Sequence, residues 1–177
     1  GKNVGACEYS DCCVMSFHPV KHVTTGEGGI ILTNNEGLWR QAKRLRSHGI
    51  TNTLADLQTD SIPGRWYYEQ QILGYNYRIT DIQCALGLSQ LTKLPEFMRR
   101  RREIVEIYNS SFRACPNVTV PFELHKCRSN FHLYVLLIDF ENAGISRNAF
   151  MTTLLENGMQ TQVHYIPVHT QPYFRKQ

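Results

Sequence analysis

The sequence predicts an α/β protein, because short apolar stretches of strand character alternate along the chain with helical patterns. Two strand-like stretches, residues 12–17 and 29–33, precede the first helical pattern. A later group, over residues 132–164, has a strand-like stretch, a helix and another strand-like stretch in that order. The chain has no internal repeat and no low-complexity tract.

The first helix is marked by the residues at its two ends. Asn34 or Asn35 is expected to cap a helix that runs to about Ser47, and Gly49 lies just past its end. Residues 50–72 are then predicted to form one long loop. A loop of this length in a compact domain is usually functional or mobile.

Two further helices are predicted in the middle of the chain. Thr80 is expected to cap the first of them, with Gln83 completing a capping box. Pro95 fits the first turn of the second, so we expect a break in the helix before it. We place the boundary between two domains here, with residues 1–94 in the first domain and residues 95–177 in the second.

The second half of the chain changes character. Pro116 and Pro121 are expected to keep residues 115–128 in a loop. A small domain with the order strand, helix, strand is then predicted over residues 132–140, 146–157 and 159–164, and Gly158 ends its helix.

Composition fits a soluble cytoplasmic protein. The 177 residues are 42% hydrophobic and 19% charged, which is enough for a real core but not for a large two-domain enzyme. No apolar run approaches the roughly 20 residues that span a bilayer, and no secretory segment opens the chain, so we expect no membrane partner. The six cysteines form no CxxC pair, which favours reduced, packed thiols.

The net charge is +4, and the densest positive run is Arg99 to Arg102. Such a run is compatible with nucleic-acid binding. However, it lies inside a helical pattern with Glu103 and Glu106, and this favours a solvated helix face. We expect no nucleic-acid partner.

Lys21 is the main candidate for chemistry. It follows a short apolar stretch and precedes a loop of small residues, within the run SFHPVKHVTTGEGG over residues 16–29. Lysine forms Schiff bases with pyridoxal phosphate. The hydroxyl of Ser16 and the amides near Gly26 and Gly28 are suitable neighbours for a phosphate. The alternative is an ordinary solvated lysine, which is the common case for an isolated lysine before such a loop.

Three stretches in the same order resemble the DegT-type (fold type I) sugar aminotransferases: residues 16–29, residues 73–83 (LGYNYRITDIQ) and residues 163–169 (VHYIPVH). The resemblance covers essentially the whole chain. It implies that residues 1–94 form the C-terminal part of the large pyridoxal-phosphate domain, and that residues 95–177 form a linking helix and an incomplete small α/β domain. In this resemblance the chain corresponds to the middle and later part of a longer enzyme, so we expect it to be a fragment.

The resemblance implies roles for single residues. Lys21 would carry the cofactor as a Schiff base and then move protons between substrate and cofactor. Ser16 and Asn76 would bind the cofactor phosphate, with Asn76 reaching into the neighbouring subunit of a homodimer that shares its active sites. Arg78, His164 and Tyr165 would face the substrate, although a surface ion pair for Arg78 and simple packing for Tyr165 explain these residues equally well.

No metal site is predicted. Two histidine pairs, His18 with His22 and His164 with His169, have a spacing that raises the question. A proline lies inside each pair, and no carboxylate completes a ligand set at His164 and His169.

The implied function is pyridoxal-phosphate-dependent transamination of a 4-keto nucleotide sugar, with glutamate as amino donor. The closest likeness is to the branch that makes UDP-4-amino-4,6-dideoxy-N-acetyl-β-L-altrosamine, a precursor of pseudaminic acid. The family's aspartate at the pyridine nitrogen belongs upstream and matches no residue here. The alternative is therefore a non-catalytic fragment, or a regulatory or dimerisation module of the same fold. A dehydratase relative would replace the lysine, and Lys21 argues against it.

Overall fold

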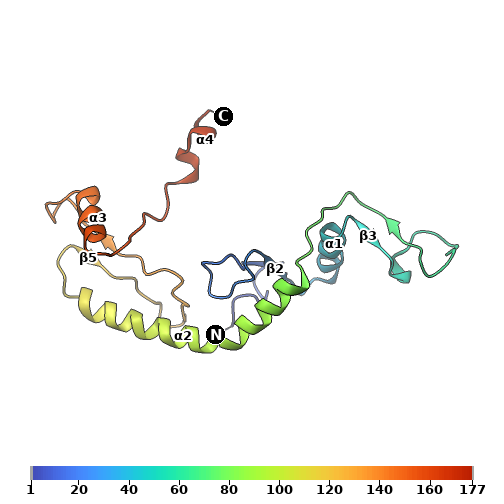
Figure 1. Cartoon of the computed structure of the whole chain (residues 1–177), viewed down its shortest axis with the longest axis horizontal. Helices are drawn as coiled ribbons and strands as arrows, with labels where there is room; N and C mark the ends of the chain where they lie inside the picture. The colour runs from blue at the N-terminus through green and yellow to red at the C-terminus, as the bar shows by residue number, and fades with distance from the viewer. Residues whose placement is uncertain (1, 177) are drawn as a thin grey trace. The chain divides into compact units, whose positions relative to one another are not determined.

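The computed structural model describes residues 2–176 and is a mixed α/β structure, as predicted (Figure 1). Its strands form two-stranded antiparallel sheets, in which β1 pairs with β2, β3 with β4, and β5 with β6. The elements in chain order are β1 Cys13–Ser16, β2 Gly29–Leu32, α1 Glu36–Arg46, β3 Ile50–Thr51, η1 Leu54–Asp56, β4 Glu69–Gln70, α2 Asp81–Phe112, β5 Val118–Thr119, β6 Leu137–Ile138, α3 Arg147–Glu156, η2 Val168–Thr170 and α4 Pro172–Arg175.

The chain divides into two compact units. The first comprises Gly1–Ile104 together with Glu123–His132, and the second comprises Val105–Phe122 and Leu133–Gln177. Helix α2 begins in the first unit and ends in the second. The predicted domain boundary between residues 94 and 95 stays a prediction.

Strands β1 and β2 form a hairpin in which Cys13 pairs with Leu32 and Ser16 pairs with Gly29. Both strands lie inside the predicted stretches. The apolar sequence of residues 12–17 predicts a buried strand, and this was wrong, because Val14 is 70% exposed. Successive side chains of a strand point to opposite faces, and a two-stranded sheet covers neither face by itself.

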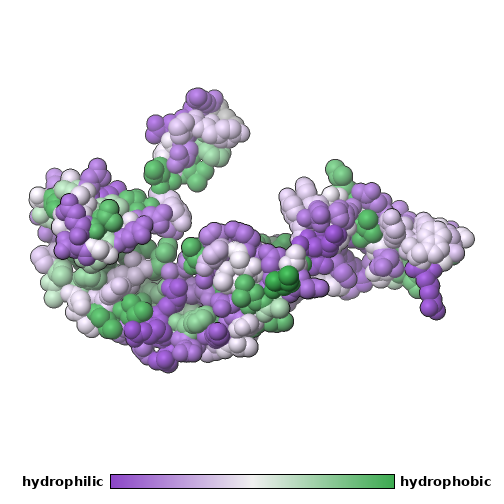
Figure 2. Space-filling view, in the orientation of Figure 1, coloured by the Kyte–Doolittle hydropathy of each residue, from purple (hydrophilic) through white to green (hydrophobic). Residues whose placement is uncertain are grey.

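The buried core in the described residues is much smaller than the composition predicts. Val23 and Val105 are the buried hydrophobic residues in the described part of the chain. Figure 2 shows hydrophobic residues at the surface in many places. Separate two-stranded sheets offer no broad apolar face for helices to cover, so most large apolar side chains remain accessible.

Helix α1 has the predicted cap and end. The Asn35 side chain accepts a hydrogen bond from the Leu38 amide at 3.0 Å, and Gly49 has the left-handed φ of +73°. Residues 73–77 then pair with the end of the helix: the amide of Tyr75 donates to the Leu45 carbonyl at 2.6 Å. These bonds satisfy carbonyls that a helix end leaves without a partner.

The close approach of the two segments depends on a pair of glycines. A Cβ on Gly74 would lie 2.1 Å from the Gly49 nitrogen, and a Cβ on Gly49 would lie 1.8 Å from the Ile72 carbonyl oxygen. Either contact is far below van der Waals distance. The segment that carries Asn76 therefore reaches α1 only because both positions lack a side chain.

Residues 50–72 are not one structureless loop, so that prediction was wrong. β3 and β4 pair across it, with Thr51 opposite Glu69. The Glu69 carboxylate accepts bonds from the amides of Gln58 and Thr59 at 2.7 and 3.0 Å, and from the Gln71 side chain at 2.8 Å. These bonds, with the Gln58 amide the largest cause, lower the pKa of Glu69.

Helix α2 begins with the predicted capping box. The Gln83 amide donates to the Thr80 hydroxyl at 3.3 Å, and the Thr80 amide donates to the Gln83 side chain at 3.1 Å. The predicted break at Pro95 was wrong, because α2 is continuous through it (Figure 1). Pro95 removes one helical hydrogen bond at a cost of about 3 kcal/mol.

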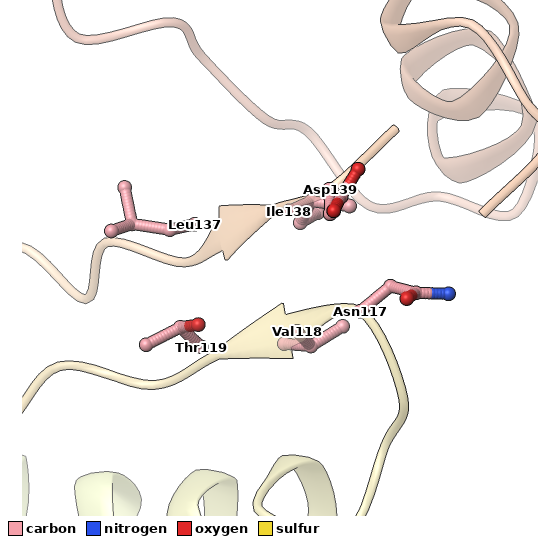
Figure 3. Close-up of a pocket in the computed structure, with 6 residues that line it drawn as sticks. All are labelled: Asn117, Val118, Thr119, Leu137, Ile138 and Asp139. Carbon is pink, nitrogen blue, oxygen red and sulfur yellow. The ribbon is translucent and has the colours of Figure 1, made fainter. Parts of the chain in front are cut away.

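The second unit contains β5 and β6, with Val118 opposite Ile138 (Figure 3). β5 falls in the predicted loop 115–128, and the predicted strand 132–140 shortens to β6. The predicted strand 159–164 was wrong: those residues are exposed and have no neighbouring strand in the described structure. A strand needs a partner for its backbone groups, and none lies there.

Helix α3 of the second unit agrees with the prediction. Ser146 caps it by accepting a bond from the Ala149 amide at 3.2 Å, and Gly158 has a φ of +78° just past its end. Within residues 2–176, no helix has both the length and the apolar composition needed to cross a membrane.

Replacing Gly74 with alanine should destabilise the fold. The new methyl group would collide with backbone atoms of the turn after α1, and overpacking of this kind costs about 1–3 kcal/mol. Denaturant unfolding of Gly74→Ala should show this loss. The matched control is Gly37→Ala inside α1, where a Cβ meets only the tip of the Asn35 side chain and should leave stability unchanged or higher. Equal stability of the two variants would contradict the close approach.

Acid should release the loop that Glu69 organises. Because the folded-state pKa of Glu69 is lowered, its contribution is complete above the ordinary value of 4.5 and is lost as the pH falls through the lower folded value. The amide resonances of Gln58 and Thr59 should therefore titrate together with a midpoint below 4.5. In Glu69→Gln this titration should disappear. A midpoint above the ordinary value would refute the assignment.

Candidate active site

Lys21 lies in the connection between β1 and β2, in the first unit. Its amide donates to the His18 carbonyl at 2.9 Å, which closes a turn directly before it. The connection continues the hairpin ladder, since the Phe17 amide donates to the Gly28 carbonyl at 2.8 Å and the Thr25 amide donates to the Phe17 carbonyl at 3.0 Å. The Lys21 side chain is half-buried. The lysine is therefore presented by an ordered loop.

The Gly-rich part of this loop packs on the start of α2. Buried Thr25 donates its hydroxyl to the Glu27 carbonyl at 2.7 Å, and that carbonyl also accepts a bond from the Gln83 side chain at 2.9 Å. Glycines allow the contact: a Cβ on Gly28 would lie 2.4 Å from the Thr25 hydroxyl oxygen, and one on Gly87 of α2 would lie 2.9 Å from the Thr25 methyl group. Gln83 of the α2 capping box thus also holds residues 17–28, the connection between β1 and β2, which we call the lysine loop.

The neighbours of Lys21 include two imidazole rings. The Lys21 Nζ lies 3.5 Å from Nε2 of His132, at the long end of the hydrogen-bond range. His22 Nε2 donates to the carbonyl of Asn130 at 3.1 Å, and the rings of His22 and His132 have centroids 5.2 Å apart. Burial, together with the charges of Arg101 and Lys21, lowers the pKa of His22 against the opposing effect of its backbone bond. His22 is therefore a neutral donor at pH 7.

Two arginines of the basic run hold the segment that brings His132 to this site. Arg101 donates to the last two carbonyls of the segment 123–132, at 3.3 and 3.4 Å. Arg102 pairs with Glu123 at 2.9 Å and donates to the Ser129 carbonyl at 2.6 Å. We call these two side chains and their bonds the arginine clamp. The Arg102 side chain, followed by the Ser129 amide, lowers the pKa of Glu123.

The predicted solvated helix face is correct for half of the basic run. Arg99 and Arg100 are exposed and pair with Glu103, one turn away on α2. Arg101 and Arg102 instead bind backbone carbonyls of another segment, so for them the prediction was wrong. The sequence does not show which arginines of a run face a neighbouring segment, because this depends on where the chain returns.

The other predicted site residues are spread over both units. Exposed Ser16 ends β1, and its hydroxyl oxygen accepts a bond from the His18 amide at 3.2 Å. Asn76 is exposed, and its backbone forms an isolated antiparallel β-bridge with Ser47. Arg78, two residues later, is also exposed. Neither Asn76 nor Arg78 is among the described contacts of Lys21.

His164 and Tyr165 belong to the second unit. Both side chains are exposed, and their rings pack on each other with centroids 3.7 Å apart and 35° between the planes. Ser16 and Lys21 therefore lie at the end of β1 and in the connection that follows it, and Asn76 and Arg78 lie on another segment of the same unit. His164 and Tyr165 lie in the second unit.

Sequence reasoning missed His132, Asn130 and Arg101. His132 is 111 positions from Lys21, and it lies in none of the three motif-like stretches. A lone histidine in a polar segment gives no local signal of a site. Only the returning segment 123–132 and its arginine clamp bring it to the lysine.

Two other kinds of site receive no support from the described residues. No group of three or more His, Cys, Asp or Glu side chains among residues 2–176 is arranged to hold a metal ion. An open hollow in the second unit is lined by Asn117–Thr119 and Leu137–Asp139 (Figure 3). Its one titratable side chain, Asp139, is engaged by Asn142, whose amide is the main cause of a lowered Asp139 pKa.

Comparison with known proteins agrees with the resemblance of the three sequence motifs. The sequence profile of the DegT/DnrJ/EryC1/StrS aminotransferase family matches residues 1–177. The chain belongs to this family. The fold is shared with solved members: PseC of Helicobacter pylori, an aminotransferase involved in pseudoaminic acid biosynthesis, has a TM-score of 0.81 and 33% identity, over 95% of this chain and 42% of PseC.

Two further members are similar. Spr1654 of Streptococcus pneumoniae, described as a putative sugar aminotransferase, has in its PMP form a TM-score of 0.81 and 28% identity, over 97% of this chain and 43% of its own. The spore coat polysaccharide biosynthesis protein SpsC of Bacillus subtilis is 38% identical over 168 residues, which are 94% of this chain and 43% of SpsC. The chain thus spans less than half the length of these relatives.

Weakening the arginine clamp should loosen the segment that carries His132. Arg102→Met removes the ion pair and the bond to the Ser129 carbonyl, and a partly buried pair of this kind contributes on the order of 1 kcal/mol. Amide hydrogen exchange in residues 123–132 should become about fivefold faster. Arg99→Met is the matched control, because Arg99 pairs only within α2, and it should leave this exchange unchanged. Unchanged exchange in Arg102→Met would show that the clamp does not hold the segment.

Proposed function

We propose that this chain carries the lysine-bearing part of the active site of a pyridoxal-phosphate-dependent sugar aminotransferase. Lys21 is the residue that binds the cofactor. The observation that supports this most directly is the half-buried Lys21, whose Nζ lies 3.5 Å from His132 Nε2, in a hydrogen-bonded connection that packs on α2. Membership of the aminotransferase family supports the same reaction class.

The residues around Lys21 fit the cofactor. The primary amine of Lys21 is present for an aldehyde, and the Arg101 cation of α2 suits a phosphate dianion. Ser16 accepts the His18 amide through its oxygen, which leaves the hydroxyl proton as a donor. Gly26 has a φ of +80°, and a Cβ there would meet no atom within 4 Å, so a flat ligand has open access to this backbone. The contact to the pyridine nitrogen has no matching residue in the chain.

Each residue has a simple role in this proposal. Lys21 binds the cofactor through Nζ and later, as a free amine, takes and returns the proton at the substrate carbon. Ser16 donates its hydroxyl to the phosphate and holds that end in place. When bound, pyridoxal phosphate supplies the electron sink for the amino-group transfer.

Asn76 is proposed to bind the cofactor phosphate of a neighbouring subunit, in a homodimer with shared active sites. The surroundings of Asn76 support an interface: Leu73 is 88% exposed, and the rings of Tyr75 and Tyr77 stack 4.8 Å apart with 55% and 71% of these residues exposed. Aromatic residues are enriched at protein interfaces.

The substrate is proposed to be a 4-keto nucleotide sugar, specifically a UDP-linked 4-keto-6-deoxy amino sugar of pseudaminic acid-type biosynthesis, with glutamate as amino donor. The pseudoaminic acid role of PseC and the polysaccharide role of SpsC support this class. Arg78, His164 and Tyr165 are proposed to bind it. We place the protein in the cytoplasm, because all six cysteines are free thiols, as a reducing compartment favours.

The second candidate is a non-catalytic interaction or dimerisation module of the same fold. The observation that favours it is the exposed apolar surface, which includes Ile82 and Leu88 of α2 at 84% and 67%. Exposed apolar patches mark surfaces that bind other protein segments. The two candidates differ in whether Lys21 reacts with the cofactor.

The deciding experiment adds pyridoxal phosphate, reduces with borohydride and maps the labelled peptide. One stoichiometric adduct on Lys21 is expected, and Lys21→Ala should lose it together with any glutamate half-reaction, by about 10²-fold or more. The matched control is Lys43→Ala, which removes a lysine packed on the Trp39 ring and should label normally. Labelling scattered over several lysines, or absent altogether, would favour the non-catalytic module.

A further inference from the structure

The contact between Lys21 and His132 joins two groups that can donate or accept a hydrogen bond. A protonated lysine amine has three donors and no acceptor. When Lys21 carries this proton, the facing nitrogen, Nε2 of His132 at 3.5 Å, accepts from it as the unprotonated nitrogen of a neutral ring. The ring proton is then on Nδ1.

The position of His132 is fixed from two sides. Arg101 of α2 donates to the backbone carbonyl of His132 at 3.4 Å. His22 packs its ring against that of His132, with centroids 5.2 Å apart, and is itself tied to the Asn130 carbonyl. The His132 ring is therefore held in place before it contacts the flexible Lys21 side chain. A ring held in this way can orient the Lys21 amine.

The charges around this pair are mainly positive. Lys21 comes from the β1–β2 connection and Arg101 comes from α2, while three carboxylates of the first unit are engaged elsewhere: Glu27 lies 3.7 Å from His18, Glu103 binds Arg99 and Arg100, and Glu123 binds Arg102. Two adjacent cations repel, so an ammonium on Lys21 and an imidazolium on His132 disfavour each other.

We propose that His132 orients Lys21 and acts as its general base: its Nε2 accepts a hydrogen bond from the Lys21 ammonium, orients Nζ and receives the proton that the amine must lose before it attacks a carbonyl carbon. In this step one Nζ–H bond breaks, an Nε2–H bond forms and the electron pair stays on Nζ. The resulting imidazolium returns its proton to water. The inference rests on the proposed function, because the carbonyl compound is the aldehyde cofactor.

The tautomer of His132 tests the pair without cofactor. Long-range ¹H–¹⁵N correlation spectra of the ¹⁵N-labelled chain, at a pH where the ring is neutral, should show the proton on Nδ1. In Lys21→Met the acceptor role ends, and the ring should shift toward the Nε2–H form that free imidazole side chains favour in water. Lys43→Met is the matched control and should leave the His132 signals unchanged. An Nε2–H ring in the unmodified chain, or the same tautomer in Lys21→Met, would overturn the proposal.

The rate of labelling tests what the contact does. His132→Phe keeps an aromatic ring but has no acceptor, and the rate of borohydride-trapped pyridoxal-phosphate labelling at Lys21 should fall about tenfold, as expected for the loss of one hydrogen bond to a charged group. His132→Gln restores an acceptor without a proton-accepting ring nitrogen and should recover part of the rate. His125→Phe changes an exposed histidine of the same segment and should label normally.

The two proposals fail in different ways. If Lys21 is not labelled in the unmodified chain, the proposed function fails, while the tautomer still reports on the pair. If Lys21 is labelled at the same rate in His132→Phe, the proposed function stands and the role of His132 is refuted.

Discussion

The site depends on one set of contacts, the hydrogen bonds that Arg101 and Arg102 of α2 make with the segment 123–132. This segment has no helix or strand of its own to fix its path. Its backbone carbonyls are instead bound by guanidinium groups, whose several donors in a rigid fork can hold more than one acceptor. Because Arg101 binds the carbonyls of Phe131 and His132, it fixes the backbone from which the His132 ring extends.

The same helix positions the other half of the site. Its cap residue Gln83 binds the Glu27 carbonyl of the lysine loop, and the missing side chain of Gly87 lets Thr25 approach. Helix α2 thus fixes both the loop with Lys21 and the segment with His132. With so little buried apolar surface in the described residues, directional polar contacts and glycine-dependent close approaches have a larger part in defining this geometry than core packing has.

Local signals in the sequence were reliable, and predictions that depend on long-range packing were not. The caps at Asn35, Thr80 and Ser146 were predicted because each bond involves residues three apart. The predicted break at Pro95 was wrong because α2 is continuous through it, and a local proline signal does not show whether a helix ends there. Lys21 was predicted as the cofactor lysine from its resemblance to a known family, and this role stays a prediction. His132 was missed, since its role arises from a chain return that no local pattern encodes.

The central claim is that the lysine loop and the returning segment form one site in which the Lys21 amine meets the His132 ring. The most direct measurement is a nuclear Overhauser experiment between the Lys21 ε-methylene protons and the ring protons of His132. We expect a clear cross-peak that weakens in Arg101→Met, where the His132 carbonyl loses its donor. No cross-peak in the unmodified chain, with both resonances assigned and sharp, would show that the two side chains do not meet.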